Sequence, residues 1–520
     1  MPVPGAPPGA TSPLVAGLDV GTTAVKGVLV DEDGLVVERC RLASGVVVGA
    51  GGRFQHDARA TWWEAPPAAL GRLLGGPAGG RLQAVAVSAM MPSVAAVDAS
   101  GRPVGPGLLY GDPRGRDPDE QGEAGADPTA SYEMARLSGW AAADAPGAAG
   151  LWPAQAVANA ALGGPGTIDL ASAFASGPLF GGSGWDPAIC DSHGFGPEQL
   201  PRVAMFGEAI GHVAPGAWRG EPGGESSGGP GGESSGGPGG AHPGDVVLGA
   251  GAGAVVLGAG AVDGLCEQLV AGAVNDGDVL VALGSTLVVW LCVPGWPDEV
   301  PGLWRVPHIA AGKAMVGGAS NAGGMWVDWV DRALRPGNAG PEVDQPPGDV
   351  PLWWPWARGE RVPWHDPSLT ITLGHAQLSQ GPLALRRAAL EASAFVARHI
   401  ISLAAAGTGT RPRRFILSGG GTANGAWVQA LADVLGEAVT PMATPEGAAL
   451  GAAFLARMAA GLETSTDDAV RWARWSAPIE PRPDWAEAAG ERYQRWCQYL
   501  PVAPGPIAPG PSVSDGPGDR

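Results

Sequence analysis

The chain has 520 residues, and its 51 Asp and Glu against 32 Lys and Arg give a formal net charge of −19. This acid excess argues against nucleic acid as a partner, because phosphate backbones are bound by basic surfaces. No run of ~18 strongly apolar residues occurs, and the start lacks the basic and apolar regions of a signal peptide. We therefore expect a cytoplasmic protein without membrane contact. The five cysteines lack paired metal-ligand spacing, which favours reduced thiols.

Pro- and Gly-rich composition sets three segments apart from the rest of the chain. Residues 1–12 and 501–520 contain little that a core could bury, so both are expected to be disordered. Residues 219–244 contain the tandem repeat Gly-Gly-Glu-Ser-Ser-Gly-Gly-Pro and are predicted to form a flexible, low-complexity loop. The remaining length is enough for two sizeable cores.

The first folded motif, at residues 14–30, is an apolar strand, a hydroxyl-rich turn and a second apolar strand. The first strand ends in Asp19, and a carboxylate there can hold a metal-bound water. In the turn Gly21-Thr22-Thr23, the glycine lets the backbone approach an anion, and the hydroxyls and amides can hydrogen-bond phosphate oxygens. Lys26, one of only two lysines in the chain, lies beside the turn. The pattern predicts a phosphate-binding hairpin; an ordinary hairpin with β-favouring threonines is the alternative.

The same design recurs at residues 278–290, where Gly284-Ser285-Thr286 separates two apolar strands. Two such hairpins half a chain apart predict two lobes that close on one nucleotide. A third element, residues 415–424, is a strand entering a Gly-Gly-Gly turn, and the helical pattern after it ends at Gly436. A side-chain-free surface at a helix start suits a flat base or a phosphate, although such turns are often only tight connections.

Together these motifs resemble the FGGY carbohydrate kinases, which belong to the larger actin, hexokinase and heat-shock-chaperone ATPase superfamily. The resemblance extends roughly over residues 14–457, with the motifs in family order. Each motif is ordinary by itself, and jointly they are specific. They are Asp19-x-Gly-Thr-Thr-x-x-Lys26, Ala261-Val262-Asp263-Gly264 with Ala271-Gly272-Ala273-Val274-x-x-Gly277-Asp278, Gly284-Ser285-Thr286, Gly359-Glu360-Arg361-x-Pro363, and Ser418-Gly-Gly-Gly421 with Trp427-x-Gln429 and Ala432-Asp433.

The resemblance implies an α/β fold of the two-lobed, actin-like ATPase (ribonuclease H-like) type, with nucleotide and sugar in the interlobe cleft. Each lobe is expected to contain a mixed five-stranded sheet with helices on its faces. We expect the N-terminal kinase lobe at residues 13–258 and the C-terminal kinase lobe at residues 259–500.

ATP and Mg²⁺ are the cofactors that the resemblance implies, with Mg²⁺ held at Asp19 largely through water. The family's catalytic aspartate corresponds to Asp263. It follows the second of two identical Val-Val-Leu-Gly-Ala-Gly-Ala stretches, at residues 246–252 and 255–261. A carboxylate there can accept the proton of a sugar hydroxyl during phosphoryl transfer; a buried or capping aspartate is the alternative. The other residues expected to bind nucleotide are Thr22, Thr23, Lys26, Gly284, Ser285, Thr286, Gly324, Gly420, Gly421 and Asn424.

Two of these nucleotide residues have plain structural alternatives. In a hairpin, Lys26 can point to solvent. Gly324 opens an amphipathic helix, and a helix start packed against a sheet would explain that glycine equally well.

The sugar is expected to contact Met90, Met91, Asp112 and Arg114 as well as Asp263; a solvated turn with a surface ion pair is the alternative for Asp112 and Arg114. Xylulose kinases of the family usually have Met-His-Gly where this chain has Met-Met-Pro, and Trp-Asn where it has Tyr-Gly. Its glycine-rich segments resemble the D-ribulose kinase branch more closely. A ketopentose, D-ribulose or D-xylulose, is therefore the expected substrate.

Two other functions stay open, and for each the sequence contains a feature that argues against it. An actin-like ATPase would hydrolyse ATP without a sugar, but residues 418–429 and 359–361 match sugar kinases. A kinase-fold sensor would bind a sugar without turnover, but both Asp19 and Asp263 are retained. The tryptophan-rich run at residues 353–356 is expected to pack in the core or line the cleft rather than stack on sugars. A homodimer is compatible with the family.

Overall fold

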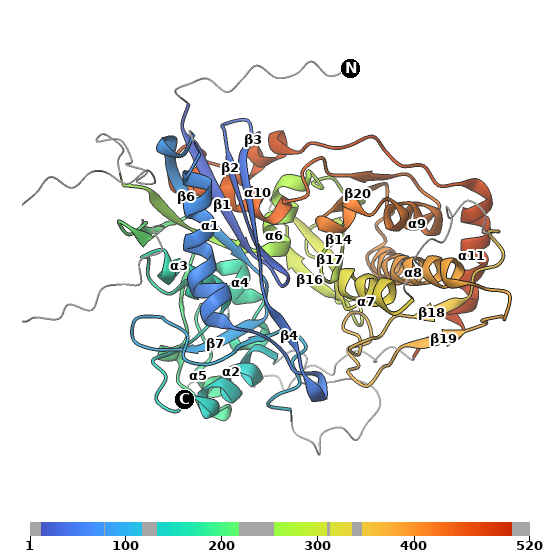
Figure 1. The fold of residues 1–520 in the computed structure, drawn as a ribbon, viewed down its shortest axis with the longest axis horizontal. Coiled ribbons are helices and arrows are strands. Elements are labelled where there is room, and N and C mark those ends of the chain that lie inside the picture. The colour runs from blue at the N-terminus through green and yellow to red at the C-terminus, as the bar shows by residue number, and fades with distance from the viewer. Residues whose placement is uncertain are drawn as a thin grey trace, which may run out of the picture.

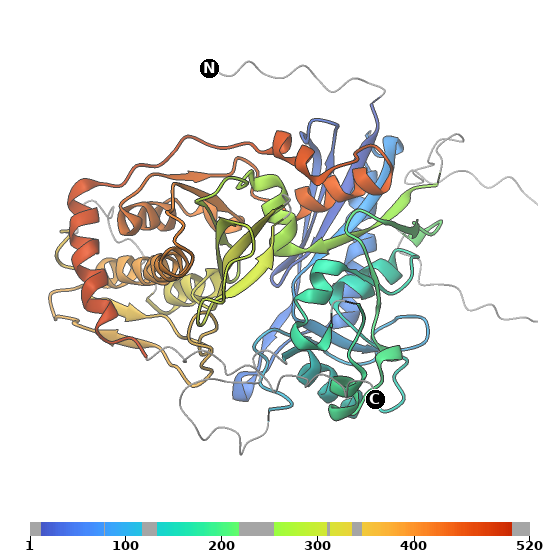
Figure 2. The same ribbon diagram turned by 180° about the vertical axis from the view of Figure 1, so that it is seen from behind.

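The computed structural model describes residues 12–76, 78–116, 133–181, 183–217, 254–308, 312–334 and 346–501. The termini expected to be disordered (apart from residues 12 and 501), the loop at residues 219–244 and the stretch 246–252 lie outside these residues. Two mixed β-sheets lie side by side, with helices α6 and α10 between them (Figures 1 and 2).

The first sheet has the strand order β12-β13-β6-β1-β2-β3. β1 pairs antiparallel with β2 and parallel with β6, and all of its residues are buried, as its unbroken apolar pattern predicts. The antiparallel register places Asp19 opposite Lys26. The strands are β1 (Leu14–Val20), β2 (Ala24–Val30), β3 (Val36–Ala43), β6 (Leu82–Ala89), β12 (Ala209–His212) and β13 (Val256–Val262).

The second sheet has the order β16-β17-β15-β14-β20-β21. Its central hairpin, β14 and β15, contains the second predicted phosphate turn, and β20 pairs parallel with β14. The strands are β14 (Asp278–Leu283), β15 (Leu287–Pro294), β16 (Trp304–Pro307), β17 (Lys313–Ser320), β20 (Arg414–Ser418) and β21 (Val439–Pro441).

The two lobes repeat one topology. The strands β3-β2-β1-β6-β13 and β17-β15-β14-β20-β21 follow the same order, with the same sequence of antiparallel and parallel pairs. The expectation of five strands per sheet is wrong, because β12 and β16 each add an edge strand. The repeated hairpins read from the sequence are the central strands of this repeat.

The helices cover the sheets on both faces, and alternate residues of β1 divide between them. Leu18 packs with residues of α1 and α3, whereas Val15 packs with residues of α6 and α10. A Cβ on Gly17 would lie 1.8 Å from Ala449 O of α10, so this close contact requires glycine. The helices are α1 (Ala65–Leu74), α2 (Glu133–Asp144), α3 (Ala154–Ala161), α4 (Leu170–Phe174), α5 (Pro187–Ser192), α6 (Asp263–Ala271), α7 (Gly324–Leu334), α8 (Pro382–Thr408), α9 (Gly425–Leu435), α10 (Gly447–Ala459) and α11 (Pro483–Cys497).

The chain passes from one sheet to the other at the end of β13. This strand pairs with β12 at residues 256–258 and with β6 over residues 256–262, so its pairing with the first sheet continues past the boundary expected at residue 258. We propose that the first lobe ends after β13. α10, which comes from the C-terminal part of the chain, packs on the sheet of this first lobe.

Smaller sheets complete both lobes. In the first, β8 (Gly107–Leu109) belongs to a five-stranded sheet that leads into the predicted sugar segment. Trp354 and Trp356 are buried in the second-lobe core, which confirms the packing role expected for the tryptophan-rich run. The remaining strands are β4 (Val46–Val48), β5 (Phe54–His56), β7 (Ser93–Val97), β9 (Gly150–Trp152), β10 (Thr167–Asp169), β11 (Arg202–Ala204), β18 (Leu352–Trp354) and β19 (Thr372–Gly374).

Within the described part of the chain, α8 is the one helix long and apolar enough to cross a bilayer, and 72% of its most apolar window is buried inside the molecule. Its apolar residues therefore pack inside the molecule.

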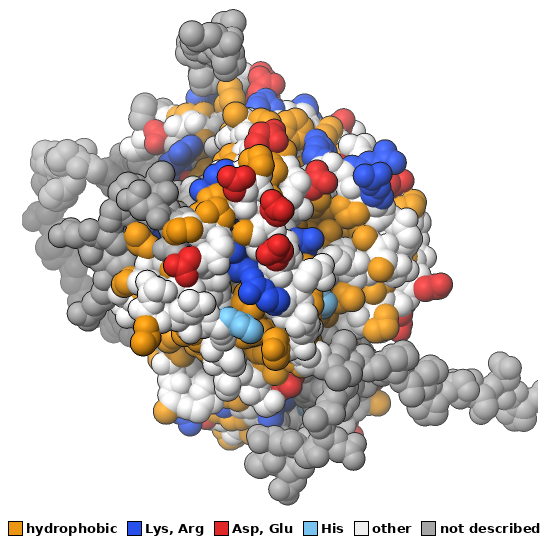
Figure 3. Space-filling model, turned by 90° about the vertical axis from the view of Figure 1, so that its right-hand side faces the viewer, with side chains coloured by type: hydrophobic (Ala, Val, Ile, Leu, Met, Phe, Trp, Pro, Cys, Tyr) orange, Lys and Arg blue, Asp and Glu red, His pale blue; other side chains and the backbone are white. Residues whose placement is uncertain are grey.

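On the face shown in Figure 3, acidic and basic side chains are interspersed. The absence of membrane and nucleic-acid partners stays a prediction.

Candidate functional site

The first hairpin turn brings an acid and a lysine together at the end of β1. Lys26 Nζ lies 3.2 Å from Asp19 Oδ2, and the lysine side chain is only 24% exposed, so it faces the acid instead of solvent. The charge of Asp19 is the main cause of the raised pKa of Lys26. The other oxygen, Asp19 Oδ1, is buried and has no hydrogen-bond partner among the described residues. The site thus contains a fixed cation and a carboxylate oxygen that can accept a ligand.

Asp263 occupies the first position of α6, directly after β13. The pKa of Asp263 is raised to about 7, first by burial and then by the negative charges of Asp19 and Glu267. The amide of Gly264, 2.8 Å from Asp263 Oδ1, and the charge of Lys26 oppose this shift. A carboxylate that titrates near neutrality suits a group that accepts a proton at physiological pH.

Glu267 lies inside the site, although it is not among the residues predicted for it. It follows Asp263 by four residues, so both carboxylates lie on one face of α6. Glu267 Oε2 accepts a hydrogen bond from Ser418 Oγ at 2.8 Å, which joins α6 to the end of β20. Burial raises the pKa of Glu267, against the opposing effects of the Ser418 hydrogen bond and Lys26. The spacing of four residues after a predicted catalytic aspartate is the signal that could have identified it.

The second hairpin turn receives the start of α7. Gly324 N donates to Gly284 O at 2.9 Å. A Cβ on Gly323 would lie 2.4 Å from Thr286 Cα, so the close packing of α7 on the turn requires glycine. The amide of Gly324 is therefore used within the protein, as the packed-helix alternative predicts. Ser285 and Thr286 remain half-exposed, and their nucleotide contacts stay predictions.

The three glycines between β20 and α9 have different surroundings. Gly419 has φ 82°. A Cβ on Gly420 would meet nothing within 4 Å, whereas one on Gly421 would lie 2.5 Å from the ring of Trp427. Asn424 Oδ1 accepts from Trp427 N at 3.2 Å and caps α9. Gly420 thus keeps an open surface of the kind expected for adenine, while Gly421 and Asn424 have structural uses of their own.

The two methionines of the predicted sugar loop differ in burial. β6 continues to Ala89 and carries Met90 into the first-lobe core, where this side chain is 2% exposed. Met90 therefore offers almost no surface to a sugar. Met91 is half-buried, packs on a neighbouring apolar cluster and precedes a cis peptide bond to Pro92.

Asp112 and Arg114 form an ion pair, with 2.7 Å between Asp112 Oδ2 and Arg114 Nη2. Asp112 is fully buried and also accepts from Phe54 N at 2.7 Å. The Arg114 guanidinium lies 4.5 Å from the ring centre of Trp140. The alternative of a solvated turn with a surface pair is therefore wrong. Asp112 fixes the loop after β8, and direct contact of either residue with a sugar stays a prediction.

Tyr110 connects this sugar segment to two other parts of the site. Its hydroxyl lies 2.8 Å from Thr22 Oγ1 of the first phosphate turn. From the second lobe, Arg358 Nη2 donates to Tyr110 O at 3.3 Å, and the Arg361 guanidinium lies 4.9 Å from the Tyr110 ring centre. Thr22 is buried, whereas Thr23 is exposed. The sequence alone shows that Tyr110 stands where the family usually has tryptophan, but it gives no sign of these contacts.

The loop that contains Arg361 is anchored by Glu360. Glu360 Oε2 accepts from Ser320 Oγ at 2.8 Å, and Glu360 Oε1 accepts from Asn321 N at 2.8 Å. Burial raises the pKa of Glu360 to about 7. The glutamate of the Gly-Glu-Arg motif therefore ties its loop to the end of β17.

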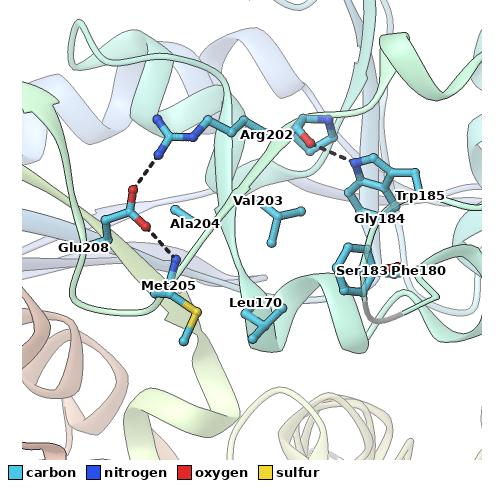
Figure 4. A pocket seen from close by; sticks show the side chains of 11 residues that line it. Leu170, Phe180, Ser183, Gly184, Trp185, Arg202, Val203, Ala204, Met205 and Glu208 are labelled. Carbon is cyan, nitrogen blue, oxygen red and sulfur yellow. Dashed lines mark hydrogen bonds and ion pairs between the residues drawn. The ribbon is translucent and has the colours of Figure 1, made fainter.

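A hollow of about 460 Å³ on the first lobe is separate from these residues (Figure 4). Its wall includes Phe180, Trp185 and Met205, with the Arg202–Glu208 ion pair along one side. It contains none of the residues predicted to bind nucleotide or sugar. The hollow is therefore not the predicted nucleotide or sugar site, and phosphoryl transfer at Asp19 and Asp263 stays a prediction.

The sequence of this chain is similar to those of known sugar kinases. A xylulose kinase from Streptomyces rubiginosus is 27% identical over 518 residues, covering 94% of this chain and 96% of that protein. A glycerol kinase from Bordetella parapertussis is 32% identical over 157 residues, which cover 30% of this chain and 28% of that protein.

The fold is also shared with solved structures. The crystal structure of xylulose kinase from Rhodospirillum rubrum superposes with a TM-score of 0.70 at 25% identity, covering 93% of this chain and 98% of that one. The predicted fold class, a two-lobed α/β structure of the actin-like ATPase type, is confirmed. The family model for the C-terminal domain of the FGGY family of carbohydrate kinases matches residues 285–460. The resemblance of this chain to the FGGY family of carbohydrate kinases is thereby confirmed.

Proposed function

We propose that this protein is an ATP-dependent kinase that transfers the γ-phosphoryl group to a hydroxyl of a ketopentose of the D-ribulose or D-xylulose class. The observation that carries the proposal is the carboxylate of Asp263, whose pKa is raised to about 7 at the start of α6. It is electrostatically coupled to Asp19 and Lys26 of the first phosphate turn. These groups can supply a proton acceptor for the alcohol, a positive charge for the phosphates and an oxygen ligand for a cation, which supports phosphoryl transfer to an alcohol.

Mg²⁺ fits the residues present at the first turn. Asp19 offers the buried, unpartnered Oδ1, a hard oxygen ligand of the kind that Mg²⁺ prefers. Among the described residues no group of three or more His, Cys, Asp or Glu forms a metal cage. This agrees with a cation held by one or two carboxylates and the substrate phosphates. Asp19 would hold the cation, which when bound neutralises phosphate charge.

The chain's own residues divide the remaining work. Asp263 accepts the proton of the sugar hydroxyl as the new oxygen–phosphorus bond forms. Lys26 and the hydroxyl of Thr22 bind the transferring phosphoryl group from the first lobe. Ser285 and Thr286 face the phosphates from the second lobe, and the open turn at Gly420 receives the adenine. Closure of the lobes excludes water, which would otherwise compete with the sugar as acceptor.

A ketopentose is favoured over glycerol by the extent of the similarities. The xylulose kinase relative matches over nearly the whole of both chains, whereas the glycerol kinase match is confined to less than a third of either. The methionine at position 91 and the tyrosine at position 110 nevertheless depart from the usual xylulose kinase pattern, so D-ribulose stays beside D-xylulose as substrate. A cytoplasmic location and a homodimer are further parts of this proposal.

A coupled assay of ADP release over D-xylulose, D-ribulose, other ketoses and glycerol tests the function. The proposal predicts turnover that depends on a ketopentose and is lost in Asp263→Asn. Hydrolysis of ATP that no sugar stimulates would indicate an actin-like ATPase instead. Sugar binding in calorimetry without any ADP release would indicate a sensor.

A further inference from the structure

Tyr110 is buried where three parts of the site meet, and its ring is fixed on several sides. The ring packs edge-to-face on Phe54 with centroids 5.4 Å apart. The Arg361 guanidinium lies over the ring, and Arg358 donates to the Tyr110 carbonyl. A tyrosine ring held by packing and by a backbone hydrogen bond has one direction for its hydroxyl, and that direction is toward Thr22.

The phosphate turn is held from its other side by a second buried chain of hydrogen bonds. His56 is fully buried, and its Nε2 lies 2.7 Å from Thr22 O. Trp62 Nε1 donates to His56 Nδ1 at 3.0 Å, so the proton of the neutral imidazole is on Nε2, which donates to Thr22 O. Burial lowers the pKa of His56, which keeps the imidazole in this neutral form. The backbone of Thr22 is therefore fixed independently of Tyr110, whose hydroxyl bonds the Thr22 side chain.

The direction of the Tyr110–Thr22 hydrogen bond decides what the threonine can do. A hydroxyl has one proton to donate and can also accept. Burial raises the pKa of Tyr110, so its phenol stays protonated and can donate. When Tyr110 donates to Thr22 Oγ1, the threonine keeps its own proton for an external acceptor. Serial hydrogen bonds of this kind polarise one another and strengthen the last donor.

We propose that Tyr110 is a positioning residue whose hydroxyl orients the Thr22 hydroxyl as a hydrogen-bond donor to the γ-phosphate of the nucleotide. This inference rests on the nucleotide site of the proposed function and does not depend on which sugar is phosphorylated. A tryptophan at this position, as in typical xylulose kinases of the family, has no hydroxyl. The tyrosine thus gives this chain a direct link from its sugar segment to its phosphate turn.

The test is calorimetric binding of a non-hydrolysable ATP analogue and of ADP, each with Mg²⁺, to the full-length protein. Tyr110→Phe removes one oxygen and keeps the ring contacts with Phe54 and Arg361. We expect it to weaken analogue binding ~3–10-fold, the usual effect of one hydrogen bond, and to leave ADP affinity unchanged. Thr22→Val should have a similar effect. The double variant should lose no more than Thr22→Val alone, because Tyr110 acts through Thr22.

Tyr493→Phe is the matched control, because it removes a hydroxyl that bonds His399 at 3.3 Å in the second-lobe core; its analogue affinity should equal that of the wild type. Thr22→Ser, which keeps the hydroxyl, should also bind normally. Unchanged analogue binding in Tyr110→Phe, an equal loss for ADP, or additive losses in the double variant would overturn the inference. A wild-type protein that binds the analogue but phosphorylates no sugar would overturn only the proposed function, whereas one that does not bind the analogue would overturn both.

Discussion

The carboxylates of Asp263 and Glu267 lie one turn apart on α6, and the charge of Glu267 helps to raise the pKa of Asp263 to about 7. Glu267 is itself held by Ser418 Oγ from the second sheet. The basicity of the proposed catalytic residue therefore depends on a neighbour that connects the two lobes. A base that titrates near neutrality is efficient at physiological pH.

This pair predicts the pH dependence of the enzyme. Below pH 7, kcat/KM should fall about tenfold per pH unit as Asp263 becomes protonated in the free enzyme. Glu267→Gln removes a negative charge, and this stabilises ionised Asp263 and lowers its pKa. The acid limb of the kcat/KM profile should therefore move to lower pH in Glu267→Gln. A midpoint that stays in place or moves upward would show that the two carboxylates are not coupled as described.

Asp263→Asn should abolish sugar phosphorylation and leave nucleotide binding nearly intact. The substitution keeps the size of the side chain and removes the proton acceptor, and a positioned base contributes ~10²–10⁴ in rate. Single-turnover kinetics and ADP calorimetry measure the two properties separately. Asp276→Asn, at a half-exposed aspartate paired with Lys313, is the control and should retain wild-type turnover. Wild-type turnover in Asp263→Asn would remove this residue from the mechanism.

Met91→His tests the departure in the sugar loop. A thioether is a weak hydrogen-bond acceptor, and a buried sugar hydroxyl left without a partner costs about 1–3 kcal/mol. In a xylulose kinase limited by this methionine, the substitution should lower KM for D-xylulose. In an enzyme adapted to D-ribulose, it should instead reduce activity on D-ribulose. Met205→His, at a side chain 52% exposed on the first lobe, should change neither value. A preference for glycerol in both the wild type and Met91→His would contradict the assigned substrate class.

Glu391→Gln should destabilise the second lobe strongly. Glu391 is fully buried in α8 and accepts from Arg387 Nε at 2.8 Å and Arg492 Nε at 2.7 Å. Loss of its charge leaves Arg492 buried beside a neutral amide, and breaking such a pair costs about 3–5 kcal/mol. Thermal unfolding should show a clear fall in Tm. Glu64→Gln, in the exposed pair with Arg59, should leave Tm nearly unchanged. Equal Tm values for the two variants would refute the argument.

The hairpins and their chemistry could be predicted from the sequence because the signals are local. Mainly apolar stretches on each side of Gly-Thr-Thr and Gly-Ser-Thr indicated the central strands of both sheets, and Gly436, with φ 69°, ends α9 as predicted. The edge strands β12 and β16 are short and only partly buried, so their composition carries little signal.

The remaining features depend on contacts between distant segments. Asp112 forms an ion pair with Arg114 and accepts a hydrogen bond from the Phe54 amide of β5, and the Tyr110 hydroxyl meets Thr22 across 88 positions of sequence. The spacing of four residues places Glu267 on the same face of α6 as Asp263, but the position of α6 between the sheets depends on contacts between distant segments. Met90 is buried because β6 extends to Ala89 and carries the next residue into the first-lobe core.

The proposed kinase activity is tested most directly by identifying the products formed from ATP, Mg²⁺ and a ketopentose by mass spectrometry and phosphorus NMR. We expect a pentulose phosphate and ADP in equal amounts with D-xylulose or D-ribulose, and neither product with Asp263→Asn. ADP and inorganic phosphate formed without any sugar phosphate would contradict it.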